Sequence, residues 1–280
     1  MTPEIPKVLS IAGVDPSGGA GILADVKTFS ALGAYGMAII AALTAQSTRG
    51  VTGFVPVDPA FVRQQWDTLA DDILPSAIKL GMLANAEVAG AVGDIIDDYH
   101  ARGGEHVVLD PVMVATSGDR LLDPDAEDVV RELVPKASLI TPNLPEAAVL
   151  LGTDVLEDAS GMADQARALL DMGAQRVMLK AGHLAGEMAV DIYADADGVV
   201  ALPARRVTTT NTHGTGCTLS SAIAALRPQR PGWGEAVRDA KGWLTHALEH
   251  ADELKVGHGH GPVHHFWDLW PEQDQGKERD

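Results

Sequence analysis

The only cysteine of the chain lies where a helix is expected to begin, in a segment suited to binding phosphate. Residues 211–218 read NTHGTGCT and lead into an alanine-rich apolar run. Small residues at a helix start leave several backbone N–H groups pointing at one place, which suits a phosphate or an oxyanion. A thiol on the first turn of a helix is expected to have a lowered pKa. We therefore predict that Cys217 acts as a general base or nucleophile; the alternative is a small buried apolar cysteine.

A second glycine-rich segment, residues 13–21 (GVDPSGGAG), lies between an expected strand and an expected helix. Ligands of open α/β sheets bind at such connections. The segment resembles a Walker A loop, but Gly19 stands where that loop needs lysine. It also resembles a dinucleotide-binding loop, but the acidic residue expected about 20 positions later is absent, because Asp58 is the first carboxylate after Asp25. A structural glycine-rich turn is therefore the alternative to a ligand-binding loop.

Asn143 and Glu146, three positions apart in the sequence TPNLPEA, support two interpretations. An Asn N-cap with Glu at the third helical position forms a capping box. The same two side chains could face a pocket at a helix start, where a carboxylate holds hydrated Mg²⁺ beside phosphates. Both interpretations stay open from the sequence.

Asp110 and Lys180 each stand at the end of an expected strand. A carboxylate and an ammonium at neighbouring strand ends could serve Mg²⁺ and polyphosphate together. An ion pair without a catalytic role is the alternative for each residue taken alone. The histidines of residues 257–266 (GHGHGPVHHF) suggest a metal site, but a loop with incidental imidazoles is favoured because no supporting carboxylate spacing accompanies them.

The elements that must position these segments alternate between strands and helices. Strands are expected at residues 7–13, 37–45, 77–83, 106–112, 138–142 and 176–180, and helices at 20–32, 59–73, 86–100, 124–133, 145–151 and 161–172. Apolar strands without polar alternation are buried on both faces, which predicts a mostly parallel sheet with helices on each side. Residues 188–207 are expected to form an antiparallel hairpin at the sheet edge, followed by helices over 214–226 and 234–254. We predict one α/β domain over residues 1–280, with a frayed tail at 271–280.

Composition excludes several classes of function. The 280 residues include 21 Lys and Arg against 39 Asp and Glu, a formal net charge of −18. Nucleic-acid binding needs clustered basic residues, so no nucleic-acid partner is expected. One cysteine forms no internal disulfide, which favours a reducing compartment. No apolar stretch approaches 18 residues and the N-terminus lacks a leader pattern, so we expect a cytoplasmic protein without membrane contacts.

Seven segments carry a resemblance to a known family. They are IAGVDPSGGAGILADVKTFSALGAYG (11–36), ALTAQSTRGV (42–51), KLGMLA (79–84), VVLDPVMVATSGDRLL (107–122), LITPNLPEA (139–147), NTHGTGCTLSSAIAA (211–225) and VGHGHGPVHHF (256–266). In this order they resemble the hydroxymethylpyrimidine/phosphomethylpyrimidine kinases of thiamine biosynthesis, which are part of the ribokinase-like superfamily. The segments cover the chain almost end to end, which makes the resemblance highly specific.

The resemblance implies a ribokinase-like three-layer α/β/α fold, a homodimer, and the use of ATP and Mg²⁺. The implied reaction phosphorylates 4-amino-5-hydroxymethyl-2-methylpyrimidine to its monophosphate and then to the diphosphate. The residues that would line the pyrimidine site are Gly13, Asp25, Thr44, Gln46 and Met82. Those that would serve Mg²⁺ and the ATP phosphates are Asp110, Asn143, Glu146 and Lys180, with Asp110 and Glu146 assigned to the metal. The anion hole would consist of Gly214, Thr215 and Gly216. We expect in-line phosphoryl transfer in which Cys217 takes the hydroxyl proton or orients the hydroxyl.

Cys217 also separates the chain from ribokinase-like sugar kinases and most pyridoxal kinases, which have an aspartate base at this position. Smaller departures from the family are Ser47 for a frequent Asn, Thr116 for a frequent Lys, and Ala181 for a frequent Gly. Thr116 puts one cationic contact to the nucleotide in doubt.

Three alternative functions remain from the sequence. A pyridoxal kinase shares the fold and the ATP site, although Gln46, whose amide can both donate to and accept from an aminopyrimidine edge, and Met82 favour the pyrimidine. A thiol-dependent hydrolase would use His213 with Cys217. A non-catalytic sensor of pyrimidine or nucleotide is the third.

Overall fold

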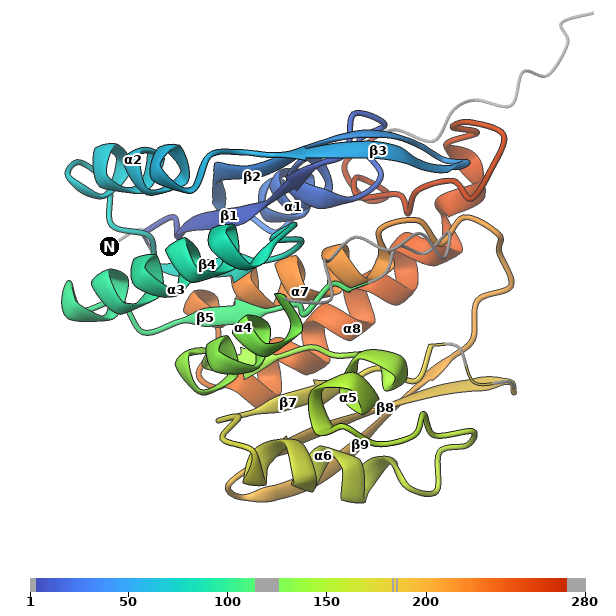
Figure 1. Cartoon of the computed structure of the whole chain (residues 1–280). Coiled ribbons are helices and arrows are strands. Elements are labelled where there is room, and N and C mark those ends of the chain that lie inside the picture. The colour runs from blue at the N-terminus through green and yellow to red at the C-terminus, as the bar shows by residue number, and fades with distance from the viewer. Residues whose placement is uncertain (1–3, 114–125, 183, 185, 271–280) are drawn as a thin grey trace, which may run out of the picture.

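The computed structural model describes residues 4–113, 126–182, 184 and 186–270, and within them nine strands form one sheet in the order β3-β2-β1-β4-β5-β6-β7-β8-β9 (Figure 1). The strands are β1 (Lys7–Val14), β2 (Tyr35–Ser47), β3 (Gly50–Pro56), β4 (Ala77–Leu80), β5 (Val107–Leu109), β6 (Leu139–Ile140), β7 (Val177–Leu179), β8 (Met188–Asp195) and β9 (Gly198–Arg205). The helices are α1 (Gly21–Ala31), α2 (Pro59–Ala70), α3 (Ala86–Ala101), α4 (Ala126–Leu133), α5 (Leu144–Leu151), α6 (Met162–Asp171), α7 (Thr215–Leu226) and α8 (Trp233–Glu249). Short 3-10 turns follow three of the helices, at Val134–Lys136, Arg227–Gln229 and Ala251–Glu253.

The middle of the sheet is parallel, and its two margins are antiparallel. β1 pairs in parallel with β2 and β4, and the parallel order continues through β5 and β6 to β7. β3 pairs antiparallel with β2 at one margin, and the β8–β9 hairpin pairs antiparallel with β7 at the other. The carboxyl ends of the parallel strands therefore meet at one end of the sheet, where open α/β sheets bind their ligands.

Helices cover both faces of the sheet. Helices α2 to α6 pack on one face, whereas α1, α7 and α8 pack on the other, and Figure 1 shows α3 and α4 in front of the sheet with α7 and α8 behind it. Alternate residues of a strand point to opposite faces. In β1, accordingly, Leu9 and Ile11 join the core with α2 and α3, whereas Val8 joins Phe29 of α1 in the core of the other face.

The helices differ in how their first turns are satisfied. Asp58 accepts a hydrogen bond from the Ala60 amide at the start of α2, and Asn85 accepts one from the Val88 amide at the start of α3. In the described structure no side chain caps α1 or α7, both of which begin in the glycine-rich segments. The first amides of a helix have no partner inside it and can bind other groups. In α7 the Thr215 amide already donates to the Thr212 carbonyl at 3.2 Å, so the amides that follow it are the ones left for a ligand.

The predicted α/β class, with a mostly parallel sheet and helices on both faces, is confirmed, and so is the antiparallel hairpin within residues 188–207. The sequence did not predict β3, because two glycines and a terminal proline are poor strand formers and this edge strand pairs with β2 alone. The predicted helix start at 124–125 and the predicted tail at 271–280 lie outside the described residues. None of the helices in the described ranges is long and apolar enough to cross a membrane.

Candidate active site

Asp110 and Lys180, which follow β5 and β7, lie side by side as their positions at strand ends predict. Lys180 Nζ is 2.9 Å from Asp110 Oδ1. Burial alone would lower the pKa of Lys180, but Asp110 and Glu146 raise it above its usual range. Burial would likewise raise the pKa of Asp110, but Lys180 and Lys79 hold it below its usual range. Both partners are therefore charged, and the pair forms a fixed electrostatic element at the carboxyl end of the sheet.

Glu146 and Asn143 form the capping box at the start of α5. The Asn143 amide donates to Glu146 Oε2 at 2.8 Å, and the Glu146 amide donates to Asn143 Oδ1 at 2.8 Å. Burial raises the pKa of Glu146 to about 7, Lys180 opposes the rise, and Asp110 adds to it. The capping interpretation is thus confirmed, and the metal interpretation stays a prediction. A carboxyl that is half protonated near neutral pH beside another carboxylate is also one that an incoming cation would ionise.

The start of α7 packs directly against residues 13–21. Gly214, the N-cap of α7, has a left-handed backbone with φ of 74°. A Cβ atom at this position would overlap the carbonyl oxygen of Gly19. A glycine is therefore required here both by the backbone conformation and by the space.

The next two residues of the predicted anion hole extend toward Lys180. A Cβ atom at Gly216 would lie 3.3 Å from Lys180 Nζ, so the bare backbone of α7 faces the ammonium. The Thr215 hydroxyl donates to the Thr212 carbonyl at 2.6 Å, which closes the turn that leads into the helix. The structure thus brings the predicted phosphate-binding amides and Lys180 to the same place.

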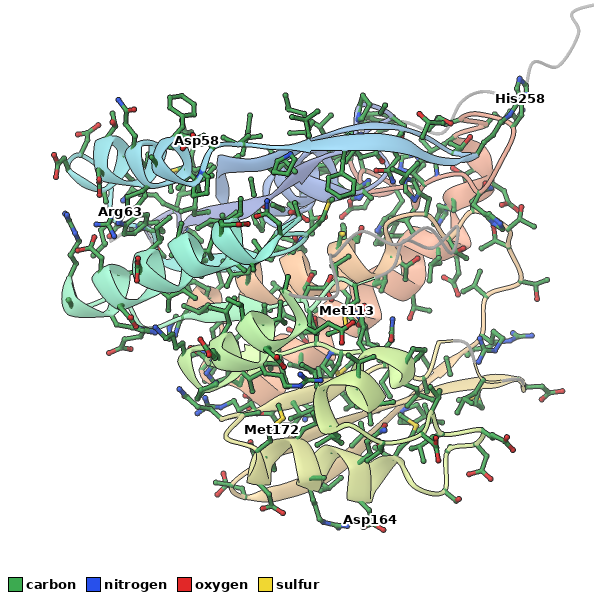
Figure 2. The ribbon with its side chains drawn as sticks, viewed as in Figure 1. Asp58, Arg63, Met113, Asp164, Met172 and His258 are labelled. Carbon is green, nitrogen blue, oxygen red and sulfur yellow. The ribbon has the colours of Figure 1, made fainter. Side chains whose placement is uncertain are left out.

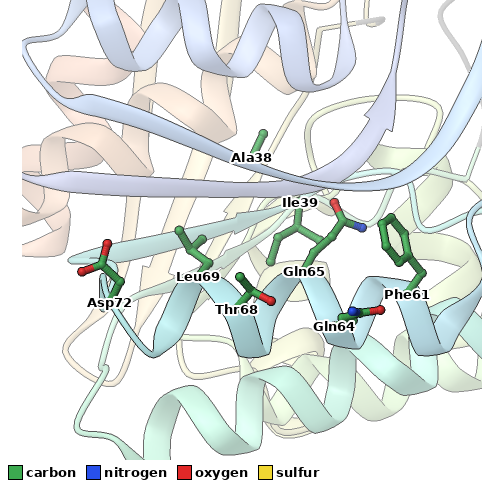
Figure 3. A pocket seen from close by; sticks show the side chains of 8 residues that line it. All are labelled: Ala38, Ile39, Phe61, Gln64, Gln65, Thr68, Leu69 and Asp72. Atoms are coloured by element: carbon green, nitrogen blue, oxygen red, sulfur yellow. The ribbon is translucent and has the colours of Figure 1, made fainter.

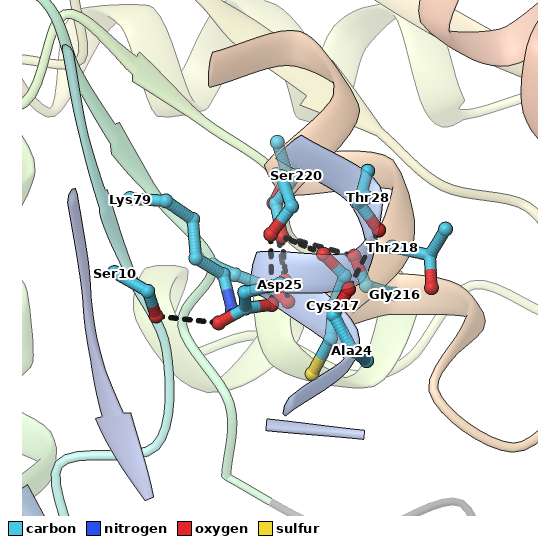
Figure 4. Close-up of polar contacts among 12 residues, drawn as sticks. Ser10, Ala24, Asp25, Thr28, Lys79, Gly216, Cys217, Thr218 and Ser220 are labelled. Carbon is cyan, nitrogen blue, oxygen red and sulfur yellow. Dashed lines mark hydrogen bonds and ion pairs between the residues drawn. The ribbon is translucent and has the colours of Figure 1, made fainter. Parts of the chain in front are cut away.

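The Cys217 thiol, on the first turn of α7, is half-buried, and its pKa is raised to about 11. Burial is the largest cause; Asp25 and Asp110 add to the rise, whereas Lys79 and a hydrogen bond from the Gly21 amide oppose it. Figure 4 shows the sulfur beside α1, with Asp25 and Lys79 close by. The prediction that the helix start lowers this pKa is wrong, because burial and two nearby carboxylates outweigh the groups that favour the thiolate.

Asp15 holds the 13–21 segment in shape. Its Oδ1 accepts from the Ser17 amide at 2.8 Å, and its Oδ2 accepts from the Ala20 amide at 3.0 Å. His213 Nε2 lies 2.7 Å from the same Oδ2 atom, which ties the segment to the residue before α7. Burial would raise the pKa of Asp15, but the hydrogen bonds from His213 and Ser17 lower it. A hydrolase would need the His213 ring at the sulfur, and in the described part of the chain the ring is hydrogen-bonded to Asp15 but not to Cys217, so the hydrolase hypothesis loses support.

Four of the five residues predicted for the pyrimidine site gather at the ends of β1, β2 and β4. A Cβ atom at Gly13 would lie 2.9 Å from Met82 Sδ, so the glycine leaves room for that side chain. Thr44 Oγ1 lies 2.9 Å from the Val14 carbonyl and 3.1 Å from Gln46 Oε1, so the Thr44 hydroxyl joins the end of β1 to the Gln46 side chain.

Asp25 is the exception. Its side chain is 0% exposed and forms an ion pair with Lys79. Its oxygens are bonded to Lys79, Ser10 and Ser221. The structure therefore does not support the prediction that the Asp25 side chain lines the pyrimidine site, because both carboxylate oxygens are already used inside the protein.

Sequence reasoning assigned no role to Lys79 or Asp15. The signal for Lys79 was present, since a lysine inside the apolar run AIKLGML must be paired if that run is a buried strand. The signal for Asp15 was weaker, because only the fold brings His213 to it. Thr116, which stands where the family frequently has a lysine that could contact the nucleotide, lies outside the described residues.

Two other features lie apart from the site. A hollow of about 450 Å³ between α2 and the amino half of β2 is lined by residues such as Phe61 and Gln65, and none of the predicted site residues borders it (Figure 3). The histidine-rich segment is exposed at its tip, where Figure 2 shows His258, and it is anchored by His265, whose Nε2 lies 3.1 Å from Thr218 Oγ1. Among the described residues no group of three His, Cys, Asp or Glu side chains could hold a metal ion.

Comparison with known proteins gives one consistent family. Residues 15–264 match the phosphomethylpyrimidine kinase family. The hydroxymethylpyrimidine/phosphomethylpyrimidine kinase of Escherichia coli is 51% identical over 263 residues, which is 94% of this chain and 98% of that protein. The enzyme of the same name from Bacillus subtilis is 40% identical over 94% of this chain and 96% of its own.

Solved structures agree with these matches. The phosphomethylpyrimidine kinase of Clostridium difficile superposes with a TM-score of 0.76 at 37% identity, covering 88% of this chain and 100% of that one. The pyridoxal kinase of Staphylococcus aureus in complex with AMP-PCP and pyridoxal superposes with a TM-score of 0.85 at 33% identity, covering 95% of this chain and 96% of that one.

Gly214→Ala should weaken both the fold and the phosphate-binding turn. Alanine at this position would be held in a left-handed backbone conformation, and its Cβ atom would overlap the Gly19 carbonyl oxygen. We therefore expect a loss of about 1–3 kcal/mol in the free energy of unfolding. Denaturant unfolding measures this loss. Gly90→Ala is the matched control, because nothing lies within 4 Å of a Cβ there and alanine favours the helix by about 1 kcal/mol. Equal effects of the two substitutions would contradict the packing described here.

Glu146→Gln should change how stability depends on pH. Burial raises the pKa of Glu146 from 4.5 to about 7, so between these values the folded protein keeps a proton that the unfolded chain releases. This group therefore makes the free energy of unfolding fall as the pH rises from about 4.5 to about 7. Glutamine can still accept from the Asn143 amide, so the variant should lose that part of the slope, as measured by denaturant unfolding at pH 5, 6 and 7. An unchanged slope would show that Glu146 is ionised in the folded protein.

Proposed function

Because the chain belongs to the phosphomethylpyrimidine kinase family, we propose that it uses ATP to phosphorylate 4-amino-5-hydroxymethyl-2-methylpyrimidine and then to phosphorylate the monophosphate to the diphosphate, in thiamine biosynthesis. Relatives whose name includes both kinase activities, hydroxymethylpyrimidine kinase and phosphomethylpyrimidine kinase, align with 94% of this chain.

One observation supports this function best: the phosphate-binding turn and the pyrimidine-site residues meet at Cys217. The sulfur sits on the first turn of α7, beside the amides of Gly214 to Cys217, and it receives a hydrogen bond from Gly21, which begins α1 after the 13–21 segment. A Cβ atom at Gly21 would overlap the Gly13 carbonyl oxygen, so the two ends of that segment are in contact, and Met82 packs at Gly13. An alcohol held by the pyrimidine-site residues would thus present its hydroxyl to the thiol and to a phosphate bound by α7.

The first phosphorylation transfers a phosphoryl group to a neutral alcohol. The hydroxyl oxygen forms a bond to the γ-phosphorus, the bond from that phosphorus to the β–γ bridging oxygen breaks, ADP leaves, and the hydroxyl proton is lost. With a pKa of about 11, Cys217 is a protonated thiol in the resting protein, and in that form it can orient the hydroxyl but cannot take its proton. We therefore assign it the role of orienting the hydroxyl, and it accepts the hydroxyl proton only as the thiolate, after its own proton has been lost to solvent. The α7 amides and Lys180 stabilise the charge on the transferring oxygens.

The second phosphorylation has a different nucleophile. A phosphate monoester loses its second proton near pH 6, so its oxygen attacks as an anion at neutral pH and needs no base. Cys217 therefore matters chiefly for the first step. The cradle formed by Gly214, Thr215 and Gly216, with Lys180, serves both steps.

Mg²⁺ would be held by Glu146 and Asp110 together with the ATP phosphates. Mg²⁺ is commonly bound by one or two carboxylates with phosphates and water completing its shell, so two carboxyls suffice. Burial is the largest cause of the raised Glu146 pKa and the Asp110 carboxylate adds to it, and a shared cation would oppose both and favour the ionised Glu146. When bound, the ion supplies neutralisation of phosphate charge; Asn143 keeps Glu146 in place through the capping box.

We further propose that residues 1–280 act as one kinase domain in the cytoplasm and that two copies form a homodimer. Two exposed apolar side chains at the sheet margin favour a dimer. Leu43 of β2 and Val55 of β3 are paired across the two strands and are exposed on the same face, where a second copy could cover them. Light scattering of the purified chain should give twice the mass of 29.4 kDa. Replacing both residues with Lys should yield monomers if this margin is the interface, whereas a wild-type monomer would contradict the dimer.

The two-step assay tests the proposed function. The purified chain with ATP and Mg²⁺ should convert the pyrimidine alcohol to the monophosphate and then to the diphosphate, followed by chromatography of the products. Cys217→Ala should lower kcat of the first step by about 10²–10⁴-fold, the usual contribution of a proton-accepting group, and should affect the second step far less. Its affinity for ATP, measured by calorimetry, should stay unchanged.

Pyridoxal is the substrate to include for comparison, since the pyridoxal kinase of Staphylococcus aureus shares the fold closely. A higher kcat/KM for pyridoxal than for the pyrimidine would overturn the proposed substrate. Equal losses in both steps for Cys217→Ala would overturn the role given to the thiol.

A further inference from the structure

A fully buried ion pair lies beneath the active site. Lys79 Nζ is 2.9 Å from each carboxylate oxygen of Asp25, and both side chains are 0% exposed. Ser10 donates to Asp25 at 2.6 Å and Ser221 donates to it at 2.7 Å. The pair thus joins β4, α1, β1 and α7, as the close-up in Figure 4 shows for Lys79, Asp25 and Ser10.

The position of this pair is tied to the catalytic groups on two sides. Ser221 lies one helical turn after Cys217 on α7, so Asp25 fixes the helix that carries the thiol. A Cβ atom at Gly81 would lie 2.8 Å from Lys79 Nζ, so the backbone that leads to Met82 leaves space for the ammonium. The same pair therefore contacts the helix of the thiol and the strand end of the pyrimidine site.

Stability alone is a weak reason for such a pair. Taking two charges out of water is costly, and replacing a buried ion pair by apolar residues of similar size is often neutral or stabilising. Lys79 also stays protonated throughout the physiological pH range, because its pKa is raised. Burial would lower this pKa, but Asp25, Cys217 and Asp110 raise it. A permanent positive charge is therefore maintained inside the protein next to the thiol.

The charged groups around Cys217 come from several elements. Lys79 of β4 favours the thiolate, whereas Asp25 of α1 and Asp110, after β5, oppose it. Lys180, after β7, also interacts with the thiol. Lys79 and Lys180 are thus cations that favour the thiolate, and the Gly21 amide is the neutral donor that acts in the same direction.

We propose that Lys79 is a positioning residue for the first phosphorylation: anchored by Asp25, its buried ammonium supports the negative charge that develops at Cys217 and the substrate hydroxyl. The proposal rests on the proposed function for its catalytic consequence. Its electrostatic part concerns the thiol alone and can be tested without any substrate.

The electrostatic test uses the fact that Cys217 is the only cysteine of the chain, so alkylation reports on it alone. The thiolate is the reactive form, so the rate of alkylation by iodoacetamide at pH 9 follows the thiolate fraction. Lys79→Met removes the cation and should lower this rate by about tenfold, which corresponds to one pKa unit. Asp25→Asn removes the opposing carboxylate while keeping the shape, and should raise the rate by about tenfold.

Opposite signs separate the proposal from a purely structural role. Loosening of the fold would expose the sulfur in both variants and raise both rates, and such a result, or no change in either, would overturn the proposal. The double variant Asp25→Asn with Lys79→Met should fall between the two single variants. If Lys79→Met does not fold, Asp25→Asn and the double variant still decide, because the double variant must then react more slowly than Asp25→Asn.

Lys241→Met is the matched control. Lys241 is a buried lysine paired with Asp191 at 2.7 Å, and it joins α8 to β8 instead of the elements around Cys217. Its loss should leave the alkylation rate within about twofold of wild type. Thermal unfolding followed by circular dichroism checks that all variants are folded.

The catalytic arm then compares the two phosphorylation steps. Lys79→Met should lower kcat of the first step by about tenfold, one pKa unit at the thiol, while KM for ATP and the rate of the second step change little. Absence of kinase activity in the wild-type chain would refute the proposed function and leave the alkylation result intact. Wild-type activity with equal losses in both steps of Lys79→Met would refute the positioning role alone.

Discussion

The contact between residues 13–21 and the start of α7 is the constraint on which the rest of the site depends. Gly214 can approach the Gly19 carbonyl only because it has no side chain, and the bond between His213 and Asp15 holds the two segments together. This contact sets the Cys217 sulfur against the Gly21 amide. It also brings the start of α7, which no side chain caps, close to Lys180, so in the proposed function the thiol and the phosphate-binding groups would act on one point.

Local charge pairing explains how a chain with a net charge of −18 can bind a nucleotide. The overall field repels phosphate, and the site offsets this repulsion with groups that are fixed in place. The Lys180–Asp110 pair faces the phosphate turn, and the Lys79–Asp25 pair lies beneath it. A helix start supplies amides without adding a mobile charge. In such a site the thiol stays protonated until substrate arrives, because burial and two carboxylates disfavour its anion.

Much of this arrangement follows from the sequence, and the rest depends on burial. The meeting of Asp110 with Lys180 could be predicted, because parallel strands end at the same end of a sheet. The capping box of Asn143 and Glu146 was visible as spacing, but the raised pKa of Glu146 was not, since it results from how deeply the helix start is buried. The same limit applies to Asp25 and to Cys217. A resemblance to a family predicts which site a residue belongs to. The hydrogen-bond partners and the burial of its side chain determine its charge state and its role in that site.

Protection of the single thiol is the measurement that tests the central claim most directly, namely that Cys217 sits where the pyrimidine alcohol and the ATP phosphates meet. Cys217 alkylation would be timed with the pyrimidine alcohol, with a non-hydrolysable ATP analogue and Mg²⁺, and with all of them together. The account predicts partial protection by the alcohol and much stronger protection when the alcohol and the nucleotide are both present. An alkylation rate that neither ligand changes would contradict it.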